Sequence, residues 1–176
     1  MSPAMLTGVK DIRARIAAVA FAALAFDTAV AAQSLLSKQP PRLNVAAEPP
    51  AHVSAGKPFT IALRLTPAAG IHVYAPGNPN YIPVAIEIAP TAGVKASAPA
   101  FPPGEDLFFG PLKESVKVYS APFVVTLPVT LDPKMVKAGD PLIRGKVSYQ
   151  ACDDRVCFPP QSAPFEARLS LKRRSS

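Results

Sequence analysis

The chain contains two cysteines, Cys152 and Cys157, and both lie in the segment Tyr149–Pro160, YQACDDRVCFPP. Alternating apolar and polar residues before Cys152 predict that it ends a β-strand. Asp153-Asp154-Arg155 then forms a polar turn, and the prolines after Phe158 stiffen the exit. The two sulfurs can therefore meet across a tight loop or hairpin, where they could form a structural disulfide, bind a metal ion or exchange electrons.

A structural disulfide is the simplest interpretation, because paired cysteines in an exported protein usually become stabilising bridges. A ring this short, however, contributes only about 2 kcal/mol in the chain-entropy model, near the low end for disulfides. A domain of this length can bury a core without such a bridge, and the inter-sheet disulfide of immunoglobulin domains spans much more sequence. Stability alone is therefore a weak reason for the pair.

A copper or zinc carrier is a second alternative, in which His52 or His72 joins the two sulfurs. Zinc would need a fourth ligand and usually a tighter cysteine spacing. A copper-handling protein would be expected to offer more methionines than Met135, the one that lies beyond the N-terminal region. We therefore expect no metal site.

A redox couple is the third alternative. Asp153 and Asp154 lie beside the cysteines, and neighbouring anions raise the pKa of a thiol, with Arg155 opposing them in part. Such a pair is a poor spontaneous nucleophile and a better passive carrier. Its disulfide is attacked by a reduced donor, and its dithiol reacts when a partner docks.

Short stretches that alternate apolar and polar residues run through the rest of the chain, between turns rich in proline and glycine. Such alternation predicts half-buried β-strands. The pattern predicts an all-β protein, an immunoglobulin-like antiparallel β-sandwich of roughly seven to nine strands. The clearest alternating runs are Phe59–Leu65, Val84–Ile88, Phe123–Leu131 and Phe165–Leu171.

Three further features of these stretches bear on the site. Pro128 interrupts the best strand, so that strand should lie at a sheet edge or be bulged there. Two segments, 75–81 and 98–113, read as long irregular loops. Loops of that length in a compact domain are more often functional than accidental.

The N-terminal residues have the features of a cleavable signal peptide, predicted over residues 1–32. Basic residues precede the apolar run Ile16–Phe26, and small residues follow it. That run is about half of the roughly 20 residues that span a bilayer, and no later segment is long and apolar enough, so we expect an exported chain without a membrane span. Residues 33–41 are predicted to form a flexible leader, 42–172 the domain, and 173–176 a disordered tail.

The net charge of +7 does not indicate nucleic-acid binding, because the basic residues are scattered and form no stripe with aromatic residues. A solvated surface is the better interpretation. We expect a monomer.

Three motifs resemble one protein family. VSYQACDDRVCFPP, together with GIHVYAPGNPNYIPV and EDLFFGPLKESVKVY upstream, is similar to the N-terminal periplasmic domain of the thiol:disulfide interchange protein DsbD, over about Leu43 to Leu171. The resemblance implies an immunoglobulin-like domain in the periplasm that needs no cofactor. It implies that the cysteine pair accepts electrons from a thioredoxin-like domain and passes them to periplasmic oxidoreductases, such as disulfide isomerases and cytochrome c maturation proteins.

The same resemblance implies roles for individual residues. Cys152 and Cys157 would be the redox pair, with Cys157 forming the mixed disulfide with partners. A cap loop that covers the sulfurs corresponds to 106–110, with Phe108 as the lid residue. Phe108 and its neighbour Phe109 are equally compatible with a place in the core.

Three more residues follow from the motifs. Asp106 would be the one remaining acid of an acidic pair, because Leu107 replaces the second. His72 and Tyr74 match an aromatic pair beside the cysteines, with histidine in place of a tyrosine. His72 could be structural or could move protons, since its ordinary pKa of about 6.5 suits exchange with a thiol, while Tyr74 could simply pack and Asp106 could lie in a solvated turn.

The chain ends at Ser176, without the transmembrane conduit or the C-terminal thioredoxin-like domain of the full-length family protein. We therefore expect a separate electron donor, either membrane-embedded or thioredoxin-like. The expected activity is that of a protein-disulfide reductase component, and the main alternative is a non-catalytic binding or scaffold domain with a structural disulfide.

Overall fold

The computed structural model describes residues 41–109, 113–134 and 140–172. The predicted signal peptide, most of the leader, the tail after 172 and Gly110 of the predicted cap loop lie outside these residues. The described part begins at Pro41, which is also where one compact unit of the chain begins. The domain bounds 42 and 172 remain a prediction.

The described residues form eleven β-strands and no α-helix, so the predicted all-β class is confirmed. The strands are β1 Leu43–Glu48, β2 Pro58–Pro67, β3 His72–Tyr74, β4 Ala85–Ile88, β5 Val94–Ala96, β6 Glu105–Phe109, β7 Glu114–Tyr119, β8 Phe123–Leu131, β9 Leu142–Tyr149, β10 Ala151–Cys152 and β11 Gln161–Arg168. All four alternating runs lie in or overlap strands. The count exceeds the expected seven to nine because β3, β5 and β10 have only two or three residues each.

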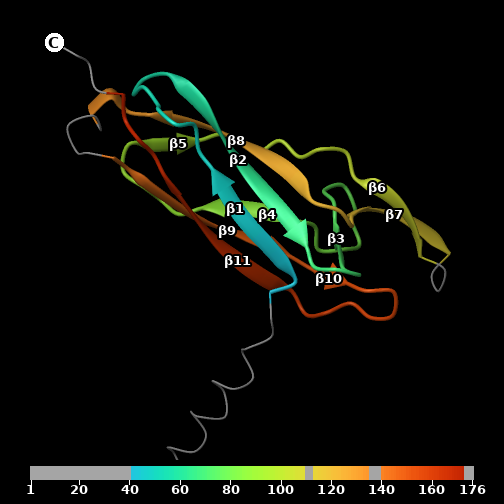
Figure 1. Ribbon diagram of the computed structural model, residues 1–176. Coiled ribbons are helices and arrows are strands. Elements are labelled where there is room, and N and C mark those ends of the chain that lie inside the picture. The colour runs from blue at the N-terminus through green and yellow to red at the C-terminus, as the bar shows by residue number, and fades with distance from the viewer. Residues whose placement is uncertain (1–40, 110–112, 135–139, 173–176) are drawn as a thin grey trace, which may run out of the picture. The chain divides into compact units, whose positions relative to one another are not determined.

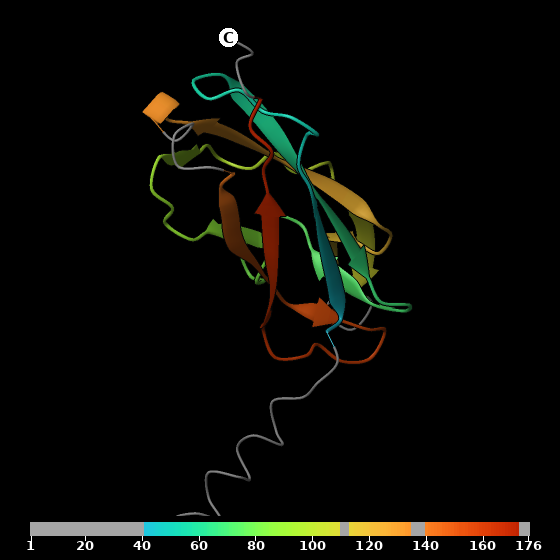
Figure 2. The same ribbon diagram turned by 60° about the vertical axis from the view of Figure 1, so that its left-hand side comes forward.

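Three antiparallel sheets build the sandwich, with strand orders β1-β2-β8-β5, β10-β3-β7-β6 and β11-β9-β4. Figure 1 shows β10, β3, β7 and β6 toward one end of the sandwich and β5 toward the other. Figure 2 shows β11 and β1 running side by side, which closes the main core between the sheets. Cys152 therefore lies in the sheet β10-β3-β7-β6, here called the small sheet, and Cys157 forms an isolated bridge with it.

Alternation along the strands separates two hydrophobic clusters. Ile61, Leu63 and Leu65 of β2 are fully buried and belong to the main core between the sheets. Burying each such side chain contributes about 1.5–3 kcal/mol. The second cluster lies in the small sheet and consists of Tyr74, Val116, Val118 and Cys152.

Pro128 does not place β8 at a sheet edge, because β8 lies between β2 and β5. The pairing is bulged instead. From Ala96 opposite Val129 to Ala100 opposite Thr126, the β5 side advances one residue further than β8. Ser97 still donates to the Pro128 carbonyl at 2.9 Å. The proline therefore stands where the ladder is interrupted, so that no hydrogen-bond donor is missed.

The segment 98–113 is not irregular throughout, so this prediction is wrong for residues 105–109. They form β6, which pairs with β7 over its whole length. Three consecutive apolar residues, Leu107 to Phe109, hide the alternation by which a strand is recognised from sequence.

Gly145 of β9 provides a test of the strand packing. A Cβ built on this residue would lie 2.5 Å from Cζ of Phe165, its partner in β11, and 2.6 Å from the Glu87 carbonyl oxygen. We expect Gly145→Ala to lower the free energy of unfolding by about 1–3 kcal/mol, measured by urea denaturation. Ser148→Ala on the same strand should change it by less than about 0.5 kcal/mol, and equal losses in both variants would contradict the packing argument.

Candidate functional site

A hairpin joins the two cysteines. β10 follows β9 after one residue, and Cys152 forms a bridge pair with Cys157. The Phe158 N–H donates to the Ala151 carbonyl at 2.8 Å, and the Asp153 N–H donates to the Val156 carbonyl at 3.0 Å. The Cα atoms of the cysteines lie 4.0 Å apart and the sulfurs form a disulfide. The prediction that the sulfurs meet across a tight hairpin is confirmed.

The two cysteines differ in burial. Ala151 points into the main core, so Cys152 points to the opposite face, where it is 1% exposed and packs in the second cluster with Val116 and Val118. Cys157, on the outer strand of the hairpin, is exposed. Of the two cysteines, Cys157 is therefore the one that is accessible from solvent.

The hydroxyl of Tyr74 lies within hydrogen-bonding distance of both sulfurs. Tyr74 lies on β3, and its hydroxyl is 3.4 Å from Sγ of Cys157 and 3.4 Å from Sγ of Cys152. Burial of the ring raises the pKa of Tyr74, and the negative charge of Glu114 raises it further. The phenol therefore keeps its proton at neutral pH and has a hydrogen bond to donate.

His72 lies directly opposite Cys152 in the pairing of β3 with β10, and the residue is 9% exposed. Its ring meets the Tyr74 ring edge to face, with centroids 6.0 Å apart. Burial lowers the pKa of His72, while the negative charges of Asp153 and Glu105 partly oppose that shift. The imidazole is therefore largely neutral at neutral pH, and whether it moves protons stays a prediction.

Asp153 holds the turn of the hairpin. One oxygen of its carboxylate, Oδ1, accepts the backbone N–H of Arg155 at 2.8 Å and that of Val156 at 2.7 Å. These two hydrogen bonds, with smaller contributions from the charges of Arg155 and Arg42, lower the pKa of Asp153. The acid that the sequence suggested as a modifier of the thiols is first of all a turn-forming residue.

The predicted cap-loop residues lie at the other edge of the small sheet, since β10 and β6 are its two outer strands. Leu107 packs against the second cluster. Alternation along β6 places Phe108, which is 65% exposed, on the opposite face, while the Asp106 carboxylate pairs with Lys117 at 2.7 Å. Phe109 pairs with Glu114 along the backbone, and its side chain lies outside the described residues.

The structure thus brings together Cys152, Cys157, Tyr74 and His72. It shows no hydrogen bond or ion pair between Asp106 and the cysteines within the described residues. The lid role of Phe108 and the proton-handling role of Asp106 remain predictions.

Sequence reasoning missed three residues that support the site. The Tyr81 ring stacks on Tyr74, with centroids 4.3 Å apart and an interplanar angle of 26°, and its hydroxyl donates to Glu114. Asn78 bonds to the backbone of Lys117 in β7. The available signal was weak: Asn78 lies in a Pro-Gly-Asn-Pro turn, and asparagine in turns often bonds to the backbone.

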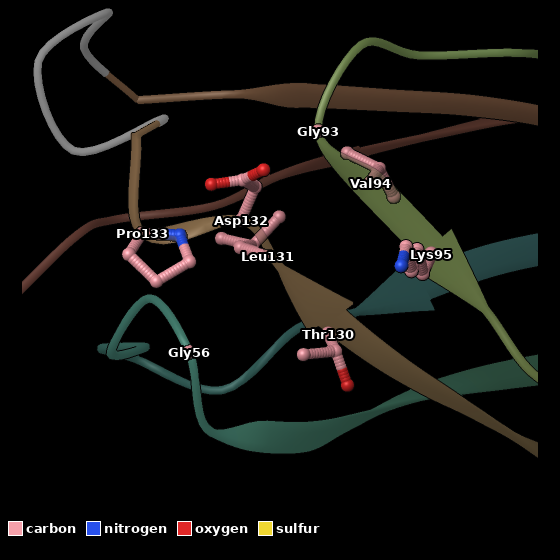
Figure 3. A pocket seen from close by; sticks show the side chains of 8 residues that line it. All are labelled: Gly56, Gly93, Val94, Lys95, Thr130, Leu131, Asp132 and Pro133. Atoms are coloured by element: carbon pink, nitrogen blue, oxygen red, sulfur yellow. The ribbon is translucent and has the colours of Figure 1, made fainter.

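The surface hollow in Figure 3 lies away from this site. Its volume is about 570 Å³. It is formed by Gly56, by Gly93 and the first residues of β5, and by the end of β8 with Asp132 and Pro133 that follow it. Its one acid, Asp132, accepts the backbone N–H of Lys134. None of the candidate site residues lines it.

Among the residues that the structure describes, no three His, Cys, Asp or Glu side chains are grouped so that they could hold a metal ion. In the same residues, no helix has the length and hydrophobicity required to cross a membrane.

Comparison with known proteins identifies the family. The family model described as "Thiol:disulfide interchange protein DsbD, N-terminal" matches residues 42–168. No curated protein matches the chain. Among solved structures, AggA, the major subunit of aggregative adherence fimbriae type I from Escherichia coli, aligns with 14% identity and a TM-score of 0.32, covering 74% of this chain and 94% of that one.

The β-sandwich, the disulfide and the family match together define a thiol:disulfide exchange domain. The chain belongs to the family of N-terminal domains of the thiol:disulfide interchange protein DsbD.

The turn at Asp153 predicts a pH dependence. Because the folded pKa of Asp153 is lowered, its contribution to the turn is present above the unfolded pKa of about 3.9 and is lost as the pH falls through the folded value. We expect the amide proton shifts of Arg155 and Val156 to titrate with a midpoint below about 3.9 in NMR spectra.

Two neighbouring variants are the controls for this titration. Asp153→Asn should abolish it, whereas Asp154→Asn, which removes an acid outside the turn hydrogen bonds, should leave it in place. A titration that survives in Asp153→Asn would contradict the assignment.

Proposed function

We propose that this domain is a periplasmic electron shuttle that works by reversible reduction of the Cys152–Cys157 disulfide. The observation that carries the proposal is the asymmetry of the pair: Cys157 is exposed and Cys152 is 1% exposed. A bridge made only for stability has no need of one accessible sulfur. A shuttle needs one sulfur that partners can reach and a second that resolves the mixed disulfide.

The exchange proceeds in two steps. A thiolate of the reduced donor attacks Sγ of Cys157 and forms a mixed disulfide; the bond to Cys152 breaks, and its electron pair leaves on the Cys152 sulfur. The second thiol of the donor, as thiolate, then attacks the donor sulfur of the mixed disulfide and releases Cys157. Two electrons have then moved to the domain, the donor is left as a disulfide, and the reverse sequence reduces an acceptor.

The resemblance of the motifs suggests the partners. We propose a membrane-embedded or thioredoxin-like protein as donor and periplasmic oxidoreductases, such as disulfide isomerases or cytochrome c maturation proteins, as acceptors. The apolar run near the N-terminus supports export to the periplasm. No cofactor enters the reaction, since every electron moves between sulfur atoms.

The redox potential distinguishes this proposal from a scaffold domain with a structural disulfide. We expect the pair to titrate above about −300 mV, in the range of periplasmic oxidoreductases, because structural bridges resist reduction to below that value. Equilibration in glutathione and dithiothreitol buffers, followed by alkylation with a mass tag, measures the reduced fraction. A potential well below −300 mV would favour the scaffold.

The difference in burial predicts which cysteine captures a partner. In Cys152→Ala, the exposed Cys157 should form mixed disulfides in periplasmic extracts, and these should disappear on reduction. Cys157→Ala is the matched control: it leaves one thiol too, but that thiol is buried at Cys152, so capture should fall at least about tenfold. Non-reducing gels and mass spectrometry count the adducts, and equal capture by both variants would contradict the assignment of Cys157.

A further inference from the structure

Hydrogen bonds join the segment 75–81 to β7. The sequence predicts this segment as a loop. The side-chain amide of Asn78 donates to the carbonyls of Ala75 and Lys117, each at 2.8 Å, and its oxygen accepts the Lys117 N–H at 3.2 Å. The Ala75 N–H also donates to the Lys117 carbonyl. The segment therefore continues the pairing of β3 with β7 through a side chain and returns the chain to the small sheet.

The end of this segment places Tyr81 against Tyr74. The two rings stack with centroids 4.3 Å apart, and the Tyr81 hydroxyl donates to the carboxylate of Glu114 at the start of β7. On another side, the His72 ring meets the Tyr74 ring edge-on. The Tyr74 ring is thus held by two aromatic neighbours, and one of them is tied to a separate strand.

The buried sulfur explains why the position of this ring matters. When the disulfide is reduced, the leaving electron pair stays on Cys152, which lies among Val116 and Val118. A buried charge without a hydrogen-bond partner is costly. Among the described residues, the Tyr74 hydroxyl is the side-chain group that hydrogen-bonds to the Cys152 sulfur.

We propose that Tyr81 and Glu114 are positioning residues for the exchange reaction, holding the Tyr74 hydroxyl where it donates a hydrogen bond to the departing Cys152 thiolate. This inference rests on the proposed electron shuttle. Tyr74 keeps its proton throughout: the sulfur–sulfur bond breaks, its electron pair goes to Cys152, and the new bond forms between Cys157 and the attacking sulfur. The raised pKa of Tyr74 agrees with this role, since the phenol remains protonated.

The test measures the rate at which dithiothreitol reduces the disulfide of the folded protein, by quenching with a mass-tagged alkylating reagent. Tyr74→Phe removes the donor and should slow reduction about tenfold. Tyr81→Phe keeps the stacked ring but loses the bond to Glu114, and Glu114→Ala loses the same bond from the other side. Each should slow reduction about threefold or more, and the double variant no further than the slower single one.

Two comparisons separate positioning from general stability. Added to Tyr74→Phe, neither Tyr81→Phe nor Glu114→Ala should slow the reaction again, because their effect passes through the missing hydroxyl. Glu114→Gln retains an acceptor for the Tyr81 hydroxyl and should recover most of the rate.

Matched controls lose similar interactions elsewhere. Tyr119→Phe removes a hydroxyl that donates to the Pro102 carbonyl at 2.7 Å, and Glu87→Gln disrupts the ion pair with Lys146. Both should leave the reduction rate unchanged, whatever they do to the melting temperature.

The outcomes distinguish the two proposals. If the wild-type disulfide resists dithiothreitol in the folded protein, the shuttle itself fails. If the wild type is reduced readily and Tyr81→Phe and Glu114→Ala match its rate, the shuttle stands and the positioning role is wrong. A further loss of rate in the Tyr74→Phe background would also overturn positioning, because the residues would then act through packing.

Discussion

The pairing of β10 with β3 is the constraint on which the site depends. Only two residue pairs form it, Ala151 with Val73 and Cys152 with His72, yet it decides which way each side chain points. Ala151 closes the main core, so Cys152 must enter the second cluster beside Tyr74. A slip of one residue would exchange these faces and turn Cys152 into the main core, away from Tyr74.

Local hydrogen bonds form the hairpin itself, whereas long-range strand pairing places the residues around its sulfurs. The turn at Asp153 is closed within four residues by its own carboxylate and backbone, which explains why the meeting of the two sulfurs could be predicted from sequence. The neighbours of the sulfurs come from β3 and β7, which lie far away in the chain. The local sequence therefore determines the shape of the hairpin, and the order of the strands in the sheet determines which side chains surround its sulfurs.

The sequence therefore predicted the strands better than the surroundings of the site. Alternation in Phe123–Leu131 predicts β8, whereas Leu107 to Phe109 show none, and the sequence therefore predicts a loop where β6 lies. Tyr74 was found through a resemblance of motifs. Tyr81 and Glu114 are 33 residues apart in the sequence. The alternation within a strand cannot predict their contact, because the order of the strands in the sheet brings them together.

A charge and a hydrogen bond act on the cysteine pair in opposite directions. Asp153, whose pKa is lowered further by its backbone hydrogen bonds, carries a negative charge at neutral pH. An anion beside the hairpin disfavours a second negative charge on sulfur. In the proposed exchange, the Tyr74 hydroxyl acts in the other direction, since a hydrogen bond to the buried Cys152 sulfur favours its thiolate. In the proposed shuttle, partners attack the exposed Cys157 while the Tyr74 hydroxyl contacts Cys152, so attack at the exposed sulfur would be coupled to stabilisation of the buried one. A shuttle built in this way would resist spontaneous reaction and would release its electron pair onto Cys152 once a partner attacks Cys157.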